Sequence, residues 1–394
     1  MPEEDRDELV GGEAPSVAAR FAFAQRAGGI AGPVATAVLA FVIGGLVVLA
    51  SGQNPLSTYR GIFDGAGLNW LFPWVTGSSR ALAASNLQQT LLLSTALILC
   101  ALAVSVGFRA GLFNIGGQGQ YLVGSIFAVW IGSSFVSMNG PLHVVLAIVI
   151  ATIAGAAYAG IAGVLRATVG AHEVIVTIML NWVAVWVGSW ALGLGGPLQS
   201  RANGASTPIS PDIASNAHLH VFWGSPVLQG LDIGFFLALA SLVVYWVTLN
   251  RTTLGFELRA VGFNREAARY SGIGVARSIV LGMVLGGAFA GLAGAVDVLG
   301  WEFRLGVGDV QASQIGFIAI AVAVLGRNTA VGVFLASILF GGLLTGTSTR
   351  NLAIARPDLA SNLTLIIQGL VVLFIGADAL VLWLWNRRRR LRTA

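Results

Sequence analysis

Long apolar runs alternate with short polar loops along most of the chain. A helix of about 20 apolar residues spans the hydrocarbon core of a bilayer, which is about 30 Å thick. Each run is therefore predicted to be a transmembrane helix, and an even number of crossings would place both ends of the chain on one side. The ten runs cover residues 28–50, 86–106, 117–137, 142–165, 172–195, 231–249, 278–300, 312–325, 329–347 and 361–385.

The polar stretch 250–277 interrupts this pattern. Asn264 stands directly before a short run of helix formers, where its side chain can cap a helix, and Gly272 follows the run as a stop signal. The stretch therefore predicts a short capped helix that lies outside the bilayer, between two membrane-spanning helices.

The composition supports a membrane-embedded chain and excludes a soluble globular one. Hydrophobic residues make up 56% of the sequence and charged residues only 10%, and the mean hydropathy is +0.82. These values predict an all-α polytopic membrane protein with about ten transmembrane helices. A lone cysteine, Cys100, lies within an apolar run and is expected to be a packing residue.

The positions of the arginines predict the orientation in the membrane. The chain has 22 basic residues, all of them arginine, and most lie in segments that the ten-helix pattern places on the same side as the N-terminus. Basic residues in short loops stay cytoplasmic, so both termini are predicted to be cytoplasmic. The net charge of +5 then reflects topology and contact with anionic lipid headgroups. Nucleic acid is not an expected partner.

The chain is predicted to divide into a disordered cytoplasmic tail at 1–27, a transmembrane domain at 28–386 and a basic cytoplasmic tail at 387–394. Within the domain, the proline-containing segment 196–230 is predicted to be an external loop that caps the outer face. His218 and His220 lie in this loop, but no third ligand is near them in the sequence, so no metal site is expected.

Two tetrapeptides resemble each other: Phe-Arg-Ala-Gly at 108–111 and Phe-Arg-Leu-Gly at 303–306. Five crossings separate them, so they must have opposite orientations, as in transporters built from inverted repeats with broken helices. A chance match of four residues is the alternative. The apolar run after the second tetrapeptide is too short to cross fully, so residues 306–314 are predicted to belong to a re-entrant or discontinuous helix.

Polar residues inside apolar runs are costly, so they are candidates for function. Glu173, Thr177 and Asn181 follow each other at intervals of four and share one helix face. Asn181 lies about 12 Å from Glu173 along the axis, near the middle of the membrane, and is a candidate for substrate contact. The alternative for Asn181 is a hydrogen bond between helices. For Glu173 the favoured interpretation is stabilisation by the helix dipole.

A second set of polar candidates follows the two tetrapeptides. Amide side chains can exchange hydrogen bonds with hydroxyl groups or base edges without a buried charge. The alternative is that these side chains satisfy the backbone of the broken helices. Together with Thr177 and Asn181, the predicted substrate path comprises Asn114, Gln118, Tyr121, Gln311 and Gln314.

The sequence offers no catalytic constellation. It lacks a nucleophile elbow and a helical His-Glu-x-x-His pattern, and a phosphate-binding loop that ends in lysine is impossible because the chain has no lysine. The chain is therefore predicted not to be an enzyme. If transport is driven by ATP, another subunit must carry the nucleotide site.

Four segments resemble the signatures of ATP-binding-cassette (ABC) importer permeases of the simple-sugar and nucleoside branch, which are related to ribose and branched-chain amino acid permeases. The resemblance covers about residues 85–385. The segments are 108–120, 173–181, 258–264 and 316–323.

This resemblance implies a permease of a bacterial inner-membrane importer that needs no cofactor of its own. ATP and Mg²⁺ are expected on a cytoplasmic ABC ATPase, and an extracytoplasmic binding protein is expected to deliver the solute. A second permease subunit is expected to complete the path, in a heterodimer rather than a homodimer. By position in the family, the coupling loop 250–277 grips the ATPase through Glu257, Arg259, Asn264, Arg265, Glu266 and Arg269.

The substrate class is the least determined expectation. The same motifs occur in sugar and nucleoside systems, and nucleosides are the favoured substrate, with simple sugars such as ribose or galactose as the alternative. An ion-coupled secondary transporter would also show inverted repeats and buried polar residues, but it would not need the capped cytoplasmic helix.

Overall fold

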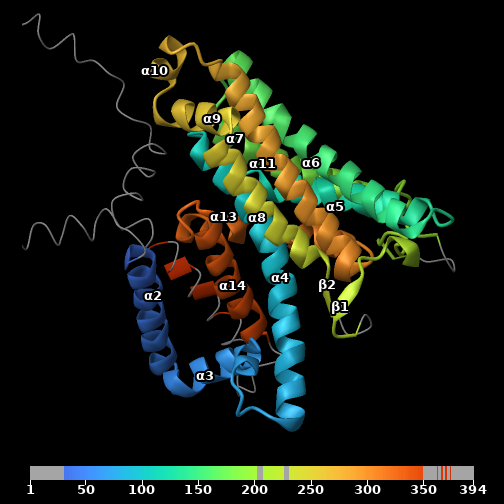
Figure 1. Cartoon of the computed structure of the whole chain (residues 1–394). Coiled ribbons are helices and arrows are strands. Elements are labelled where there is room, and N and C mark those ends of the chain that lie inside the picture. Colours follow the sequence, from blue (N-terminus) through green and yellow to red (C-terminus); the bar gives the residue numbers. More distant parts are fainter. Residues whose placement is uncertain are drawn as a thin grey trace, which may run out of the picture.

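The computed structural model describes residues 31–201, 207–225 and 230–348, with a few isolated residues between 362 and 373. Nearly all of the regular structure in these residues is helical (Figure 1). The α-helices are α2 (Ala31–Ala50), α3 (Pro55–Gly65), α4 (Gly77–Arg109), α5 (Gly117–Ser134), α6 (Gly140–Val169), α7 (Glu173–Leu192), α8 (Gly234–Arg251), α9 (Thr253–Phe263), α10 (Arg265–Tyr270), α11 (Val275–Asp297), α12 (Val307–Ala312), α13 (Ile315–Leu325) and α14 (Ala330–Gly346). The shorter elements are the 3₁₀ helices η3 (Leu68–Leu71) and η5 (Ser215–Ala217), the π-helical turn η7 (Val298–Glu302), and the antiparallel strands β1 (Val221–Trp223) and β2 (Leu231–Asp232).

Each predicted apolar run up to residue 347 coincides with a helix, which confirms the all-α polytopic fold. Among the described residues six helices are long and apolar enough to cross a membrane, and α2 with α3, bent by 118°, gives a seventh if the pair forms one broken span. The number of ten crossings stays a prediction. The predicted tails at 1–27 and 387–394 lie outside the described residues, as does most of the run at 361–385.

The centre of the bundle is α11, which packs against α4, α5 and α6. Glycines bring α11 very close to α6: a Cβ added to Gly155 would lie only 2.6 Å from the Gly287 carbonyl oxygen and from the Gly291 Cα. Small residues permit such close contact in a bilayer, where packing between helices replaces the hydrophobic effect as the main attraction. This tight core gives the broken helices a rigid frame.

The bundle is interrupted at two places, which lie at opposite ends of α11. The inner break, residues 110–116, separates α4 from α5 and contacts α9. The outer break, residues 303–314, contains the turn after η7, the short helix α12 and its junction with α13. Figure 1 shows α9 and α10 at one end of α11, and β1 and β2 at the other. Opposite ends are what an inverted arrangement of the two related tetrapeptides predicts.

The predicted external loop 196–230 packs over the outer break. The Ser210 N–H donates a hydrogen bond to the Leu305 carbonyl (2.8 Å), and the Val307 N–H donates one to the Pro208 carbonyl (3.0 Å). These bonds satisfy backbone groups that the broken helix leaves unpaired. The loop is therefore a structural part of the outer break in the residues that the structure describes.

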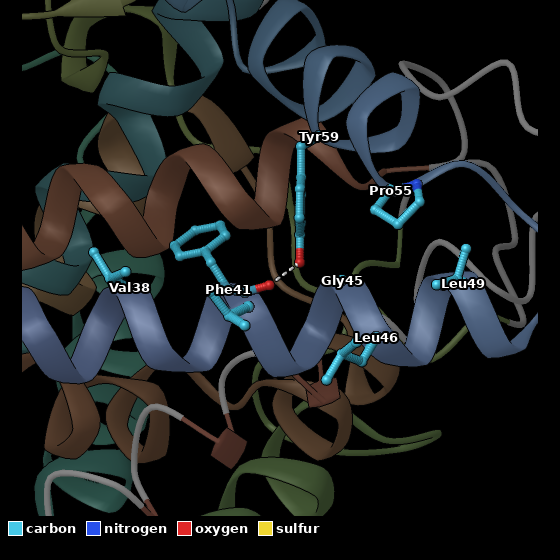
Figure 2. A pocket seen from close by; sticks show the side chains of 8 residues that line it. Val38, Phe41, Gly45, Leu46, Leu49, Pro55 and Tyr59 are labelled. Atoms are coloured by element: carbon cyan, nitrogen blue, oxygen red, sulfur yellow. Dashed lines mark hydrogen bonds between the residues drawn. The ribbon is translucent and has the colours of Figure 1, made fainter.

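A sharp corner joins α2 to α3. Asn54 caps α3 by accepting the Leu56 N–H (2.9 Å), and Pro55 takes the first helical position, where its missing N–H costs no hydrogen bond. From α3 the Tyr59 hydroxyl donates to the Phe41 carbonyl of α2 (2.5 Å), as Figure 2 shows. An apolar groove of about 500 Å³ lies between the two helices.

Candidate functional site

The inner break is closed by amide side chains that bind each other and the backbone. Asn114 and Gln120 form two reciprocal hydrogen bonds (3.0 and 3.1 Å), and the side-chain Oδ1 of Asn114 also accepts the Gly116 N–H (3.1 Å). Asn114 is almost fully buried. Its polar atoms are thus occupied by the break itself, which matches the alternative that these amides satisfy broken-helix backbone.

Asn181 of α7 holds the start of α5. Its side-chain oxygen accepts the Gly119 N–H (2.8 Å), and its Nδ2 donates to the Ile115 carbonyl (3.0 Å). The first N–H groups of a helix and the carbonyl groups of a broken segment have no partner within the helix, so one amide replaces two missing backbone bonds. Thr177 on the same face donates to the Glu173 carbonyl (2.8 Å). Both side chains are buried, and in this structure both serve the protein interior.

Gln118 ties the inner break to α13. Its Oε1 accepts the Gly316 N–H (2.8 Å), which fixes the orientation of the amide. Its Nε2 is buried and has no hydrogen-bond partner among the described residues. A buried donor without an acceptor is uncommon and marks this position as a candidate for a water or solute contact.

Glu173 pairs with Arg166 across the turn between α6 and α7 (Nε to Oε2, 3.2 Å). Its position at the first residue of α7 also suits the helix dipole. Both features support the structural interpretation of this carboxylate.

A buried carboxylate network lies next to the outer break, and sequence reasoning missed it. The Tyr121 hydroxyl and the Trp301 Nε1 both donate hydrogen bonds to the Asp297 carboxylate, and Glu302 lies at the end of the same π-helical turn. Tyr121 was predicted to contact substrate, but its hydroxyl is directed at Asp297. The signal was available, because Asp297 is a charged residue inside the apolar run 278–300.

Within the described part of the chain, no group of three or more His, Cys, Asp or Glu residues is arranged to hold a metal ion. Asp232 lies on the outer side of the network, outside the membrane-spanning helices, and accepts the Gly234 N–H (2.6 Å). Burial raises the pKa of the Asp232 carboxyl to about 6.

Gln311 and Gln314 differ from the other predicted path residues because both are exposed. The Gln311 Nε2 donates to the Ser189 Oγ of α7 (3.2 Å), and Gln314 stands at the junction of α12 and α13. These two amides therefore face outward from the bundle, where a solute or a second subunit can reach them.

The predicted short capped helix is present as α10. The Asn264 side chain accepts the N–H groups of Glu266 (2.9 Å) and Ala267 (3.0 Å), and Gly272 follows the helix with a left-handed φ of +80°. Both the cap and the stop residue were predicted from sequence. Thr252 caps the preceding helix α9 in the same way.

The predicted coupling residues divide into an exposed and a half-buried group. Asn264, Glu266 and Arg269 are exposed, whereas Glu257, Arg259 and Arg265 are half-buried. Large apolar side chains stand beside them, and sequence reasoning did not single these out. Exposed apolar side chains next to charges are typical of a protein-docking surface. They are Phe256, Phe263 and Tyr270, which are 61%, 68% and 92% exposed.

The helices α9 and α10 contact the inner break directly. Gly111 has a left-handed φ of +68°, and a Cβ added to it would lie 2.8 Å from the Gly262 Cα of α9. The Arg265 Nη2 donates to the Gly111 carbonyl (3.4 Å), and Arg109 donates to the Asn328 carbonyl (2.9 Å) at the turn between α13 and α14. Gly262 of α9 and Arg265 of α10 therefore contact the segment that precedes α5.

Two grooves on the bundle are apolar and lie apart from these polar residues. One is the groove between α2 and α3 (Figure 2). The other, of about 480 Å³, lies between α8 and α14 and is lined by Leu239, Leu242, Val243, Trp246, Ala330, Val331 and Phe334. Neither groove offers the hydrogen-bonding groups that a polar solute needs.

Known permeases resemble this chain along nearly its whole length. The guanosine ABC transporter permease protein NupP of Bacillus subtilis is 34% identical over 91% of this chain and 96% of that protein. The nucleoside ABC transporter permease protein NupB of Lactococcus lactis is 32% identical over 89% and 91%. The glucose ABC transporter permease protein TsgB13 of Haloferax volcanii is 33% identical over 87% and 86%.

Each of these organisms has a further permease that matches less closely: NupQ of Bacillus subtilis at 27% identity, NupC of Lactococcus lactis at 25% and the putative glucose permease TsgC13 of Haloferax volcanii at 28%. No solved structure matches the chain. A family model described as the permease component of branched-chain amino acid transport systems matches residues 86–376. This match covers most of the chain, which therefore belongs to that family of permease components.

Proposed function

We propose that this chain is a permease subunit of an ATP-driven importer and that it carries nucleosides by alternating access. The observation that carries the proposal is the similarity, along almost the whole chain, to permeases named for guanosine and for nucleosides. A separate ATPase binds ATP and Mg²⁺, and an extracytoplasmic binding protein delivers the solute. The chain lies in a bacterial cytoplasmic membrane, with α10 and both termini in the cytoplasm.

The partner permease in this proposal is a different chain. Support comes from the three organisms in which a closer and a more distant relative of this chain both occur. The two chains together enclose the path. The exposed amides of Gln311 and Gln314 line it, whereas Asn114 and Asn181 hold the broken helix in place.

Coupling to the ATPase passes through α10. Its exposed face, with Glu266, Arg269 and Tyr270, docks on the ATPase. The contact between Gly262 and Gly111 then transmits movement of α9 and α10 to the inner break. This gives the ATPase a mechanical connection to the start of α5 without a residue of this chain that binds ATP.

Substrate class is tested by uptake of labelled guanosine, uridine and adenosine, beside ribose, galactose and glucose, in a strain that lacks the native system and expresses the complete transporter. Nucleoside uptake that requires ATP supports the proposal. Sugar uptake alone favours the second candidate, a sugar permease, which the 33% identity to the glucose permease TsgB13 supports. Uptake that follows an ion gradient and needs no ATPase subunit would indicate a secondary transporter and overturn the proposal.

ATPase docking is tested by charge reversal on α10. Glu266→Lys and Arg269→Glu are expected to reduce the amount of ATPase that copurifies with the permease, while the permease stays in the membrane at parental level. The matched control is Arg60→Glu on α3, where the arginine side chain is 86% exposed. Full recovery of an active complex from both α10 variants would contradict this assignment.

A further inference from the structure

The helix α7 has two unlike faces. One face is buried, carries Thr177, Asn181 and Gly188, and packs against α5 and α12. The opposite face carries a row of three tryptophans at intervals of four residues, which places them on one side of the helix, about 6 Å apart along the axis. They are Trp182, Trp186 and Trp190, which are 59%, 64% and 68% exposed.

The row extends beyond the level at which tryptophans of membrane proteins usually gather. Tryptophans of a membrane protein gather at the level of the headgroups, near the ends of the spans. Trp190 lies two residues from the end of α7 and fits this rule, but Trp182 stands at the middle of the helix and Trp186 only one turn further. Trp246 of α8 is a contrasting case, because it lies near the helix end with the Arg251 guanidinium 5.3 Å from its ring centroid.

Polar groups lie beside the row. Ser189 follows Trp182 by seven residues and Trp186 by three, so all three share one side of α7. The Ser189 Oγ accepts the Gln311 amide of α12 at 3.2 Å, and Gln311 is itself exposed. A surface that faces hydrocarbon would leave the remaining hydrogen-bonding groups of this amide without partners, at a cost. The face therefore combines flat aromatic rings with an accessible amide.

We propose that Trp182 and Trp186 form a stacking surface for the nucleobase of the transported nucleoside, and that Gln311 binds the polar edge of the base. This inference rests on the proposed function, since it takes a nucleoside as the solute. An indole ring stacks on any base, because every base has a π-face, so one surface can serve purines and pyrimidines. The glutamine amide is both a donor and an acceptor and can pair with either type of base edge.

The position of the row fits a path rather than a fixed binding site. From Trp182 to Trp190 the row extends about 12 Å along the axis at 1.5 Å per residue, from the middle of α7 toward the end that carries the outer loop. A base that enters from the outer end meets Trp190 first and then Trp186 and Trp182. Because the rings offer several weak binding positions in succession, the solute can move along the row without binding tightly at any one of them, and so it is not released slowly.

The test uses the complete transporter in a strain that lacks the native system. Trp182→Leu and Trp186→Leu are each expected to lower guanosine uptake at subsaturating concentration about tenfold, the order of one base–aromatic contact. Trp186→Phe keeps a ring and is expected to retain most of the uptake. Trp246→Leu is the matched control, an exposed tryptophan on another helix, and should match the parent.

Accessibility gives an independent measurement. The one cysteine of the parent chain, Cys100, is buried, so background labelling is low. In Trp186→Cys a charged, water-soluble thiol reagent should modify the new cysteine, and guanosine should slow the reaction while glucose does not. In Ile153→Cys, at the middle of α6 and 57% exposed, the same reagent should not react, since a cysteine in contact with lipid tails stays protonated and dry.

The outcomes separate this inference from the proposed function. Leucine variants that take up guanosine as the parent does, or a Trp186→Cys chain that does not react, would overturn the stacking surface and leave nucleoside transport intact. Loss of the second permease from purified Trp186→Leu complexes would show a subunit contact instead and overturn it as well. A parent transporter that takes up only glucose would overturn both proposals.

Discussion

The two breaks in the bundle begin with nearly the same tetrapeptide yet use their polar residues differently. At the inner break the side chains of Asn114 and Asn181 are buried and bound to backbone or to another amide. At the outer break Gln311 and Gln314 are exposed, and external residues 207–213 satisfy the backbone in their place. One break is held from within the bundle, and the other is held by a loop.

This difference shows why related segments need not share a role. Side chains that replace missing backbone hydrogen bonds are not free to bind a solute, because a solute would have to displace them and expose the backbone. At the outer break the loop takes over that task and leaves two amides available. In the proposed function, the inner break transmits movement from α10 and the outer break contacts the solute.

The largest expected effect is the loss of the inner break through Gly111→Val. The residue has a left-handed φ of +68°, and a Cβ there would lie 2.8 Å from the Gly262 Cα. Overpacking costs about 1–3 kcal/mol, and a branched residue in the left-handed region adds about 1–3 kcal/mol of strain. We expect little folded protein in the membrane, measured by fluorescence-detected gel filtration. The control at the outer break is Gly308→Val, since no atom lies within 4 Å of a Cβ at Gly308. Equal loss in both variants would contradict the comparison.

The next effect concerns Asn181→Leu. The substitution leaves the Gly119 N–H and the Ile115 carbonyl without partners, at about 1–3 kcal/mol for each buried group. We expect a lower unfolding temperature of the purified complex and a parallel loss of uptake. Asn181→Asp keeps an acceptor for the Gly119 N–H but removes the donor to the Ile115 carbonyl, so it measures the contribution of each hydrogen bond separately. An Asn181→Leu chain with parental stability but no uptake would show instead that Asn181 contacts the solute.

Sequence predicted the architecture well where local signals decide it. The apolar runs predicted the positions of the long helices. The Asn264 cap and the Gly272 stop predicted both ends of α10 to within a residue or two. The short apolar run after residue 306 gave the discontinuous helix, which is interrupted at Ser313 and Gln314. These features depend on residues close in sequence, so propensity and length are sufficient to find them.

Sequence could not predict what each buried polar side chain binds. Asn181 bonds to residues more than 60 positions away, so its role depends on tertiary packing. The tryptophan row on α7 was not singled out, because Thr177 and Asn181 mark one face of the helix but do not show what lies against the opposite face. Asp297 was predictable from its charge in an apolar run, but its partners Tyr121 and Trp301 were not.

The pH dependence of stability should differ between the two breaks. Amide side chains, which do not titrate, hold the inner break, whereas carboxylates lie at the outer break. Burial raises the pKa of Asp232 from 3.8 to about 6. Between about pH 4 and pH 6 the unfolded chain loses this proton while the folded chain keeps it. The free energy of unfolding therefore falls as the pH rises through this range, by at most about 3 kcal/mol, and this contribution no longer changes above about pH 6. Asp232→Asn should flatten this slope in unfolding temperatures measured from pH 4.5 to 7.5. The control Asp64→Asn, which removes an exposed carboxylate of α3, should leave the slope as it is in the parent. An unchanged slope in Asp232→Asn would show that the Asp232 carboxyl does not cause the pH dependence.

The smallest effect on stability is expected for Gln314→Leu and Gln311→Leu. Both side chains are exposed, and substitutions at such positions change the free energy of unfolding by about 0.5 kcal/mol or less. Uptake should nevertheless fall severalfold, because the path loses an amide that can pair with the solute. Gln118→Leu is the matched change at the inner break, and it should lower the unfolding temperature, since the Gly316 N–H loses its acceptor. If Gln314→Leu destabilises the complex as much as Gln118→Leu does, the outer amides serve the backbone too, and the solute contacts must be sought elsewhere on the exposed face of α7.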